Sequence, residues 1–217
     1  MTADCDTVFF GGSFDPPHLG HLAVAAAALD SGMCRRIAWV PAYAPPHKNS
    51  HRAAFADRAA MVELTIDGRD DMFLCRIEEE LALSPSYTFC VIEAWYRRYG
   101  SLPALLIGAD SLLELHNWHR GGELAERCRI LTYPRRGYPV SAEALTVNWP
   151  PAMVEKLLSG LIDGDFFEIS SSELKSAMEK FTETGDIMNM KSFLAPGVTD
   201  YIIRRGLYIG ATPETAG

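Results

Sequence analysis

The sequence lacks the patterns that mark a disulfide framework, a zinc site or a membrane span. Its five cysteines are odd in number and widely spaced, and no Cys-x-x-Cys occurs, which argues against disulfides and structural zinc. The longest apolar run, Leu22 to Leu29, is too short to cross a bilayer, and no signal peptide precedes it. We therefore expect a soluble, cytoplasmic protein with reduced cysteines and no membrane association.

Positive charge is also scarce, because 20 Lys and Arg face 28 Asp and Glu, for a formal net charge of −8. Nucleic-acid binding depends on phosphate contacts, so this balance excludes a nucleic-acid partner. Any anion site must be a local cationic pocket in an acidic protein. The 217 residues carry no repeat, low-complexity tract or linker. We expect one domain over residues 1–217, with a core at about 5–175 and a helical part at about 176–210.

The most informative stretch runs from Thr7 to Leu22. A β-branched and aromatic run predicts a buried strand, Gly11-Gly12 interrupts it with backbone that a ligand can approach, and helix-forming residues follow His18. His18 and His21 are three residues apart at the helix start, so they face the same way. Unpaired N–H groups at a helix start favour anions. The stretch therefore predicts a phosphate site, although it is neither a Walker loop nor a dinucleotide fingerprint.

Strands and helices alternate through the chain. We expect strands at residues 36–40, 73–75, 104–107 and 129–132, and helices at residues 19–31, 58–67, 87–99 and 152–158. This alternation predicts an α/β fold with a doubly wound parallel sheet covered on both faces. Ligands in such folds bind beyond the carboxyl ends of the strands. Residues 194–208 predict a last amphipathic helix, in which we expect no chemistry.

Several loops carry candidate binding residues, each with a plainer interpretation. His47 and Lys48 follow a strand and offer phosphate donors, although the loop could simply be solvated. Thr88 could cap a helix or hold a small carboxylate at the helix start. Asp110 could cap a helix or accept hydrogen bonds from ribose hydroxyls. Trp118 lies among polar neighbours and is typical of a stacking surface for a flat ring.

Two later stretches offer further phosphate contacts. Arg135 and Arg136 follow a strand, where one guanidinium could bind a phosphate or form a surface ion pair of little energetic value. Residues 166–175 predict a strand, a serine cluster and a helix. Ser170 with Glu173 fits a capping box, and the same helix start could bind phosphate with Lys175 one turn in.

The motif from Gly11 to His21 resembles the Gly-Gly-x-Phe-x-Pro-x-His-x-Gly-His signature of the nucleotidyltransferase superfamily. Paired with Ile169-Ser170-Ser171-Ser172, it is similar to the adenylyltransferase branch. Over residues 7 to about 208 the chain resembles the bacterial nicotinate mononucleotide adenylyltransferases. The further matching segments are Pro45–Lys48, Pro85–Thr88, Ile107–Ser111, Trp118, Arg135 with Gly137-Tyr138, and Gly206–Tyr208.

The resemblance implies a Rossmann-like nucleotidyltransferase fold with a small C-terminal helical extension. It implies adenylyl transfer from ATP to nicotinate mononucleotide, which yields nicotinate adenine dinucleotide and pyrophosphate in NAD biosynthesis. ATP and nicotinate mononucleotide would be the partners. The resemblance leaves open whether the protein forms a homodimer. Mg²⁺ would be carried by the ATP phosphates without a protein metal site. No general base is needed, because the attacking phosphate is already an anion.

The resemblance also assigns residues. His18 and His21 would be catalytic, in contact with the ATP phosphates. The other ATP contacts would be Gly11, Gly12, Ser13, Phe14, Gly108, Asp110, Ser171 and Lys175. The nicotinate mononucleotide contacts would be His47, Lys48, Thr88, Trp118, His119 and Arg135.

Two positions depart from the family pattern. Lys175 stands where the family usually has Arg, and Arg135-Arg136-Gly137 replaces Arg-Pro-Gly, which leaves open which arginine reaches the substrate. A phosphopantetheine adenylyltransferase is the nearest alternative enzyme, but it would give Trp118 and Thr88 no role. A non-catalytic nucleotide sensor is an alternative of another class, motivated by Lys175.

Overall fold

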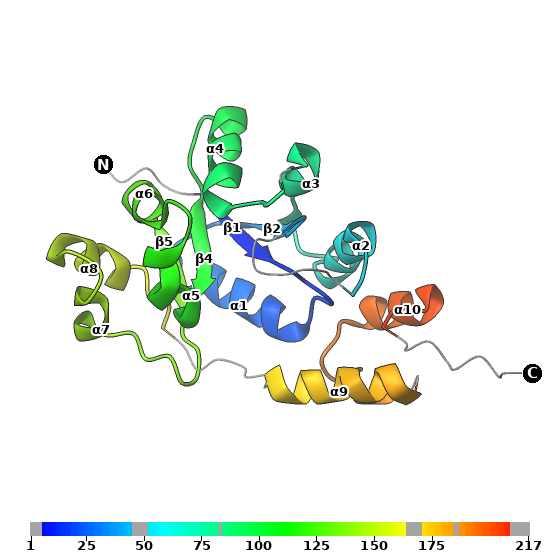
Figure 1. Ribbon diagram of the computed structural model, residues 1–217. Helices are drawn as coiled ribbons and strands as arrows, with labels where there is room; N and C mark the ends of the chain where they lie inside the picture. The colour runs from blue at the N-terminus through cyan, green and yellow to red at the C-terminus, as the bar shows by residue number, and fades with distance from the viewer. Residues whose placement is uncertain (1–5, 45–51, 83, 164–170, 185–186, 209–217) are drawn as a thin grey trace, which may run out of the picture.

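The fold is an open, five-stranded parallel sheet with helices on both faces. The computed structural model describes residues 6–44, 52–82, 84–163, 171–184 and 187–208, with the side chains of 171–175 and 189 left out. The strands are β1 (Thr7–Gly12), β2 (Arg36–Pro41), β3 (Met72–Leu74), β4 (Ala104–Gly108) and β5 (Ile130–Tyr133), and their order is β3-β2-β1-β4-β5 (Figure 1). The predicted α/β class and doubly wound parallel sheet are confirmed.

The strand order reverses beside β1. The chain adds β2 and β3 on one side of β1 and then crosses to β4 on the other side. In β1, Phe9 pairs with Leu105 of β4, while Phe10 pairs with Trp39 and Gly12 with Pro41 of β2. A reversal of this kind opens a crevice at the carboxyl ends of the two strands beside it. The carboxyl ends of β1 and β4 are therefore the expected place for a ligand.

Helices account for most of the remaining chain. They are α1 (Leu19–Asp30), α2 (Phe55–Thr65), α3 (Ile77–Leu81), α4 (Thr88–Tyr99), α5 (Ala109–Glu114), η1 (Leu115–Asn117), α6 (Gly121–Arg127), α7 (Ala142–Thr146), α8 (Pro151–Leu158), α9 (Ser171–Thr184), η2 (Ile187–Asn189) and α10 (Pro196–Arg205). No helix among these described segments is long and apolar enough to cross a membrane.

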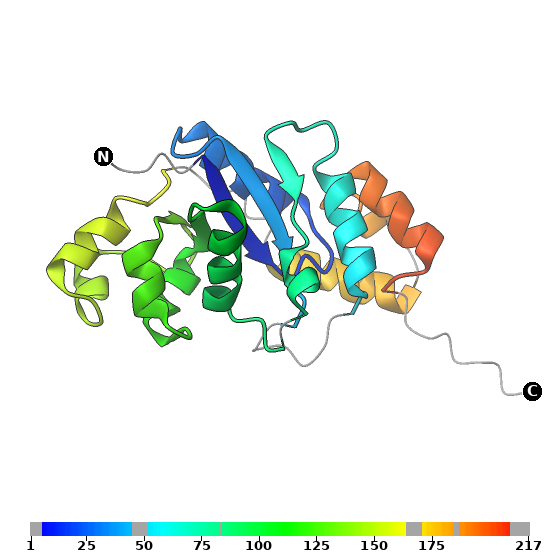
Figure 2. The same ribbon diagram turned by 90° about the horizontal axis from the view of Figure 1, so that it is seen from above.

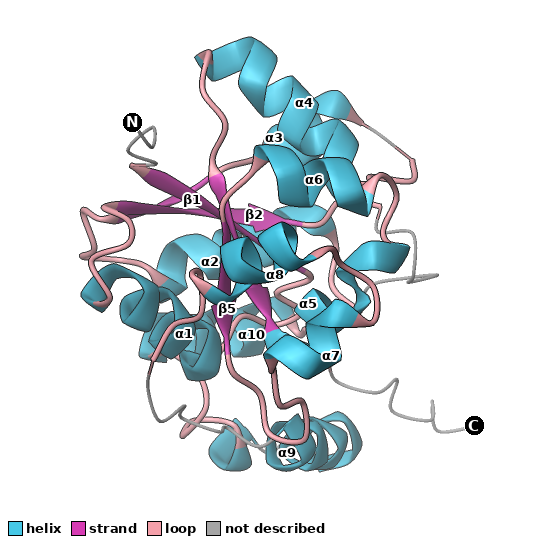
Figure 3. Cartoon of the chain, turned by 90° about the vertical axis from the view of Figure 1, so that its left-hand side faces the viewer, coloured by secondary structure: helices cyan, strands magenta, loops and turns pink. Residues whose placement is uncertain are grey.

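The alternating side chains of the strands supply two cores, one on each face of the sheet. On one face, Phe9 and Val40 pack with apolar residues of α4, α6 and α8. On the other face, Phe10 and Trp39 pack with residues of α1 and α2. Figure 3 shows the two helical layers on opposite sides of the strands. The central strands are buried on both faces, as their continuous apolar runs indicated.

The C-terminal helices form a third core against the outside of α2. Phe181 of α9 and Val198 and Ile202 of α10 are buried together with Met61 of α2. Figures 1 and 2 both place α10 beside α2. The backbone N–H of Leu19 donates to the carbonyl oxygen of Phe193 at 2.7 Å. The predicted extension therefore reaches the start of α1, which contains the last residues of the signature motif.

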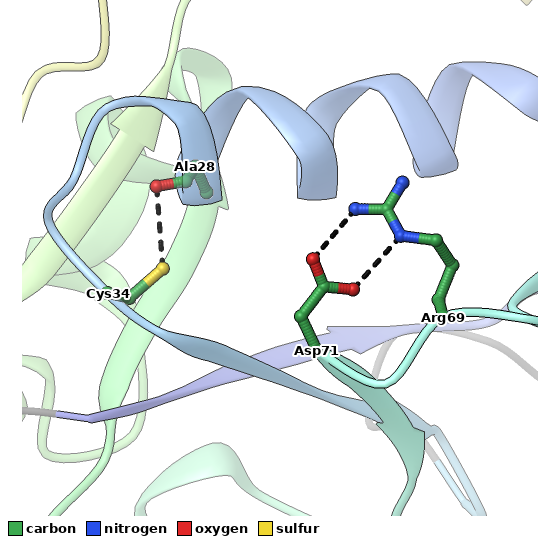
Figure 4. A network of polar contacts seen from close by, with 4 residues as sticks. All are labelled: Ala28, Cys34, Arg69 and Asp71. Atoms are coloured by element: carbon green, nitrogen blue, oxygen red, sulfur yellow. Dashed lines mark hydrogen bonds and ion pairs between the residues drawn. The ribbon is translucent and has the colours of Figure 1, made fainter.

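Polar contacts also fasten turns at the amino ends of the strands (Figure 4). The Cys34 thiol donates to the carbonyl oxygen of Ala28 at 3.4 Å, which holds the turn between α1 and β2. Arg69 donates two hydrogen bonds of 2.9 Å to the Asp71 carboxylate just before β3. These contacts lie at the amino ends of the strands, whereas the expected ligand site lies at the carboxyl ends. We therefore assign them a role in stability alone.

Several boundaries differ from the prediction. The helix expected at 58–67 runs from Phe55 to Thr65, and the helix expected at 87–99 begins at Thr88. The short helices α3, α6 and α7 were not predicted, and α5 was indicated only by the alternative that Asp110 caps a helix, whereas its N-cap is Gly108. Each has only five to seven residues, too few for a helical periodicity to show. The strand predicted near residues 166–169 lies outside the described residues.

Candidate active site

A cavity of about 490 Å³ opens at the carboxyl ends of β1 and β4, where the strand order reverses. It brings together residues that the family resemblance assigned to two different ligands, ATP and nicotinate mononucleotide. Its walls are formed by Phe9, Gly11, Gly12, Ala42, Glu78, Ser86, Tyr87, Thr88, Leu105, Leu106, Ile107, Asn117, Trp118 and His119. Among the predicted residues, Gly11 and Gly12 line it from β1, and Thr88, Trp118 and His119 line it from the opposite segments.

The two glycines at the end of β1 leave room for neighbouring aromatic rings. A Cβ atom on Gly11 would lie 2.8 Å from the Phe9 ring, and one on Gly12 would lie 3.0 Å from the Phe14 ring. Both distances are too short for ordinary packing. Because neither position has a side chain, the strand backbone itself faces the cavity.

His18 and His21 lie against each other at the start of α1. Their ring centroids are 3.7 Å apart, and the backbone N–H of His18 donates to Nδ1 of His21 at 3.2 Å. Since Nδ1 accepts, a neutral His21 ring carries its proton on Nε2 and can donate there. The predicted common orientation of the two imidazoles is thus a feature of the structure.

Both imidazoles are neutral at pH 7. Burial, aided by the positive charge of Arg135, lowers the pKa of His18 to about 4. Burial also lowers the pKa of His21 well below its usual value, and His18 and Arg135 lower it further. These rings therefore offer N–H donors to a ligand instead of full positive charges.

The backbone N–H groups at the start of α1 are less available than the sequence predicted. The Leu19 N–H donates to Phe193, and the His21 N–H donates to the His18 carbonyl oxygen at 2.9 Å. The C-terminal extension supplies the first of these acceptors, and local sequence signals do not reveal such a long-range contact. At least two of the backbone N–H groups at this helix start therefore already have acceptors within the protein.

Phe14 has a packing role that the sequence did not indicate. Its ring is 1% exposed and lies 5.0 Å from the Trp39 ring and 5.1 Å from the His21 ring, centroid to centroid. The backbone φ of 47° places Phe14 in the left-handed region. The side chain supports His21 from the core, so only the Phe14 backbone remains for the predicted nucleotide contact.

Asp110 and Arg135 form an ion pair beyond the ends of β4 and β5. Nη1 of Arg135 lies 2.5 Å from an Asp110 carboxylate oxygen. A Cβ atom on Gly108 would lie 2.4 Å from Asp110 Oδ1 and 3.0 Å from Arg135 Cδ. Gly108 therefore makes space for the pair. The family resemblance assigned Asp110 to ATP and Arg135 to nicotinate mononucleotide. It did not predict that the two side chains contact each other.

The opposite wall combines an aromatic stack with the start of α4. The His119 ring stacks on the Tyr87 ring with centroids 4.5 Å apart. Thr88 is the first residue of α4, and Tyr87 gives that helix no side-chain cap. The turn after Trp118 is tight, since a Cβ atom on Gly121 would lie 1.9 Å from the Leu115 carbonyl oxygen. Trp118 is thus held at the cavity by a turn that needs glycine.

Glu78 is a cavity residue that the sequence analysis missed. It is 6% exposed, and its carboxylate accepts the backbone N–H of Tyr43 at 2.9 Å. Burial raises the pKa of Glu78, while hydrogen bonds from Ser86 and Tyr43 and the charge of Arg58 oppose this shift. In the sequence, Glu78 stands in the run Glu78-Glu79-Glu80, which is typical of a solvent-exposed helix face. No local pattern distinguishes the buried Glu78 from its two neighbours.

Some predicted residues cannot be placed. His47 and Lys48 lie outside the described residues, as does Ser170, and the side chains of Ser171 and Lys175 are not described. The backbone of Ser171 begins α9. The predicted convergence of two phosphate-binding helix starts therefore stays a prediction.

A second cavity, of about 830 Å³, lies at the amino ends of the strands. Its cations have structural partners. The Lys156 ammonium donates to the carbonyl oxygens of Ala125 and Glu126 at the end of α6, both at 2.7 Å, and Arg127 pairs with Glu93. Such cations balance helix C-termini, so we place the active site at the carboxyl ends.

Comparison with known proteins gives a consistent picture. A model of the cytidylyltransferase-like family matches residues 9–177. A probable nicotinate-nucleotide adenylyltransferase of Serratia proteamaculans is 34% identical over 92% of this chain and 93% of its own length. One from Gloeobacter violaceus is 32% identical, with 92% and 94% covered.

Solved structures share the fold at lower identity. Plasmodium falciparum nicotinic acid mononucleotide adenylyltransferase complexed with NaAD superposes with a TM-score of 0.69 at 20% identity, covering 93% of this chain and 96% of that one. A putative nicotinate-nucleotide adenylyltransferase from Vibrio parahaemolyticus gives a TM-score of 0.60 at 18% identity, with 93% and 94% covered.

Proposed function

The chain belongs to the cytidylyltransferase-like family, and on this premise we propose that it transfers the adenylyl group of ATP to nicotinate mononucleotide. The products are nicotinate adenine dinucleotide and pyrophosphate, and the reaction is a step of NAD biosynthesis. The observation that carries the proposal is the cavity at the strand-order reversal, where the glycines of the signature motif face Thr88 and Trp118. The names of the relatives agree with this reaction.

The reaction is an in-line attack by a 5′-phosphate oxygen of nicotinate mononucleotide on the α-phosphorus of ATP. The bond from the α-phosphorus to the bridging oxygen breaks, and pyrophosphate leaves. Since the nucleophile is an anion, alignment and charge stabilisation supply the catalysis. His18 and His21 donate N–H groups to phosphate oxygens, and they do so as neutral rings at pH 7 because of their low pKa values.

The Asp110–Arg135 pair connects the two substrate sites in this proposal. Asp110 accepts hydrogen bonds from the ATP ribose, and Arg135 donates to a phosphate. In the described structure the two groups form an ion pair, so each holds the other in position for its ligand. The charge of Arg135 lowers the pKa of both imidazoles, which supports Arg135 over Arg136 as the phosphate contact in this proposal.

The cavity wall formed by α4 and η1 suits the pyridine ring. Trp118 provides a face for stacking, and Thr88 with a backbone N–H beside His119 holds the carboxylate. The uncapped start of α4 favours a negative group. A phosphopantetheine acceptor would leave this aromatic wall without a role.

The donor set near the phosphates fits a nucleotide-borne Mg²⁺. His18, His21 and Arg135 offer nitrogen donors, whereas Mg²⁺ prefers oxygen ligands and retains waters. Among the described residues no group of three or more His, Cys, Asp and Glu could hold a metal. In this proposal phosphate oxygens and water would coordinate the ion, which would neutralise charge on the phosphates.

The decisive experiment measures pyrophosphate release with ATP and one acceptor at a time. The acceptors are nicotinate mononucleotide, nicotinamide mononucleotide and phosphopantetheine. We expect release with a pyridine mononucleotide and none with phosphopantetheine. Preference for phosphopantetheine would overturn the substrate assignment, and ATP binding without release on any acceptor would identify a nucleotide sensor.

A further inference from the structure

The last described residue of the chain contacts the signature loop. Tyr208 follows α10, is 7% exposed, and has a backbone φ of 64°. Its hydroxyl donates to Asp15 Oδ1 at 2.7 Å, across 193 residues of sequence. A tyrosine in the left-handed region is strained and persists only where its surroundings hold it. The described part of the C-terminal extension thus places a side chain against the loop between β1 and α1.

The signature loop is itself strained and anchored at that point. Phe14 has a φ of 47°, and Asp15 follows it. The Asp15 carboxylate also accepts the backbone N–H groups of Arg52 at 2.6 Å and Ala53 at 3.1 Å. The unusual backbone at Phe14 is therefore held by contacts that Asp15 makes with two distant segments of the chain.

A buried arginine holds the same loop from its other side. Arg58 of α2 is 1% exposed and donates to the carbonyl oxygens of Ser13 at 2.7 Å, Ala42 at 2.7 Å and Ala53 at 3.3 Å. Ser13 follows the cavity glycines, and Ala42 lines the cavity. One guanidinium thereby joins the loop after β1 to the loop after β2.

We propose that Tyr208 and Arg58 are positioning residues for adenylyl transfer, which hold the loop from Gly11 to Asp15 in the shape the phosphates require. The inference rests on the proposed function. Arg58 donates to the Ser13 carbonyl oxygen and Tyr208 donates to the Asp15 carboxylate, so both act through the loop. Displacing a bound phosphate by 1 Å can cost about 10²-fold in rate. Loss of either contact should therefore lower kcat more than it raises KM.

The chain provides a matched control for Tyr208. The Tyr201 hydroxyl of α10 donates to Asp57 Oδ1 of α2 at 2.8 Å, and Arg205 also binds that carboxylate. Tyr208→Phe and Tyr201→Phe therefore each remove one hydroxyl from an aspartate that keeps other donors. Of the two tyrosines, only Tyr208 donates to the signature loop. We expect about a tenfold fall in kcat for Tyr208→Phe, and less than a twofold change for Tyr201→Phe.

Arg58→Lys tests the second contact, because it keeps the charge but cannot reach three carbonyl oxygens with a rigid fork. We expect a fall in kcat of about 10²-fold, with KM for ATP changed by less than about threefold. Hydrogen exchange of the peptide covering residues 9–18 gives a readout independent of the reaction. It should be faster in Tyr208→Phe and Arg58→Lys than in the wild type, and unchanged in Tyr201→Phe.

The outcomes separate the two proposals. If Tyr208→Phe and Tyr201→Phe have equal effects on kcat and on hydrogen exchange, Tyr208 only stabilises the fold. This result would overturn the inference. Normal turnover and normal exchange in Tyr208→Phe would also overturn it. If the wild type releases no pyrophosphate, the proposed function fails, and the exchange comparison alone decides whether Tyr208 and Arg58 hold the loop.

Discussion

At the scale of single residues, the two imidazoles of the signature motif owe their properties to their surroundings. His18 accommodates the His21 ring at 3.7 Å because neither ring is charged, and the Phe14 and Trp39 rings confine His21 further. A neutral donor that is already oriented need not reorganise as charge develops on a phosphate. The histidines thus resemble the donors of an oxyanion hole more than a pair of cations.

Replacing His18 with Ala removes one of these donors and tests its role. We expect kcat to fall by about 10²–10³-fold, by analogy with a lost oxyanion donor, with a folded protein by circular dichroism. Steady-state pyrophosphate release provides the measurement. A folded His18→Ala variant with wild-type turnover would contradict the catalytic assignment.

The low pKa of His18 predicts a dependence of stability on pH. The unfolded histidine titrates near 6.5 and the folded one near 4, so between these values the unfolded state binds more protons. The free energy of unfolding should therefore fall as the pH drops from 6.5 to 4, by at most about 1.4 kcal/mol per pH unit for this group.

His18→Gln isolates that contribution, because other titrating groups are common to both proteins. Denaturant unfolding of each protein at several pH values between 4 and 7.5 provides the measurement. The wild type should lose more stability than His18→Gln across the window. Parallel curves for the two proteins would show that the folded pKa of His18 is not lowered.

At the scale of secondary-structure elements, the junctions after the strands decide the shape of the site. β1 ends on two glycines that expose its backbone, β4 ends on Gly108 and passes directly into α5, and the turn after η1 needs Gly121. The sequence marked the first two junctions. It gave no bounds for α5 and did not predict α6, so it assigned Asp110 and Trp118 to the site without showing what holds them there.

Gly108→Ala tests the junction between β4 and α5. The new methyl group would lie 2.4 Å from Asp110 Oδ1, and this side chain can rotate away, so the fold should survive while the pair with Arg135 breaks. A charged hydrogen bond of about 1.5–3 kcal/mol corresponds to a roughly 10–100-fold loss in affinity. We expect KM for ATP to rise within that range.

Gly122→Ala serves as the control for this substitution. A Cβ atom there meets nothing within 4 Å, and the position lies in the first turn of α6. Its kinetics should match those of the wild type. An unchanged KM for ATP in Gly108→Ala would show that Asp110 and Arg135 do not need each other's contact.

At the scale of the whole molecule, the C-terminal helices are joined to the segment that follows the carboxyl end of β1. The third core cluster unites α9 and α10 with α2, and hydrogen bonds reach from this region to Leu19 and Asp15. The extension begins with α9 at Ser171. We therefore expect the sheet and the extension to unfold together, in keeping with the prediction of one domain.

Phe181→Ala tests this unity. Phe181 is 1% exposed in the third cluster, and its truncation should lower the free energy of unfolding by about 3–5 kcal/mol. Calorimetry should show one transition, shifted as a whole to a lower Tm. Met188→Ala, at a side chain that is 64% exposed, should change stability by no more than about 0.5 kcal/mol. Two separate transitions, with only one shifted, would divide the chain into two domains.

The sequence by itself determined the fold class, and it predicted where the site lies. The alternation of strands and helices specified a parallel sheet, and the order of strand, glycine pair, prolines and histidines predicted a phosphate-binding turn. These properties depend on residues that are near one another in the chain. Local spacing and backbone freedom, which a sequence displays directly, are sufficient to predict them.

Only the tertiary structure decided how the site is held and what charge it carries. The pairing of Asp110 with Arg135, the burial of Glu78 and Arg58, and the contact of Tyr208 with Asp15 join segments separated by 16 to 193 residues. The low pKa values of His18 and His21 arise from the same packing. Burial and long-range electrostatics are properties of the assembled chain, so no local pattern could reveal them.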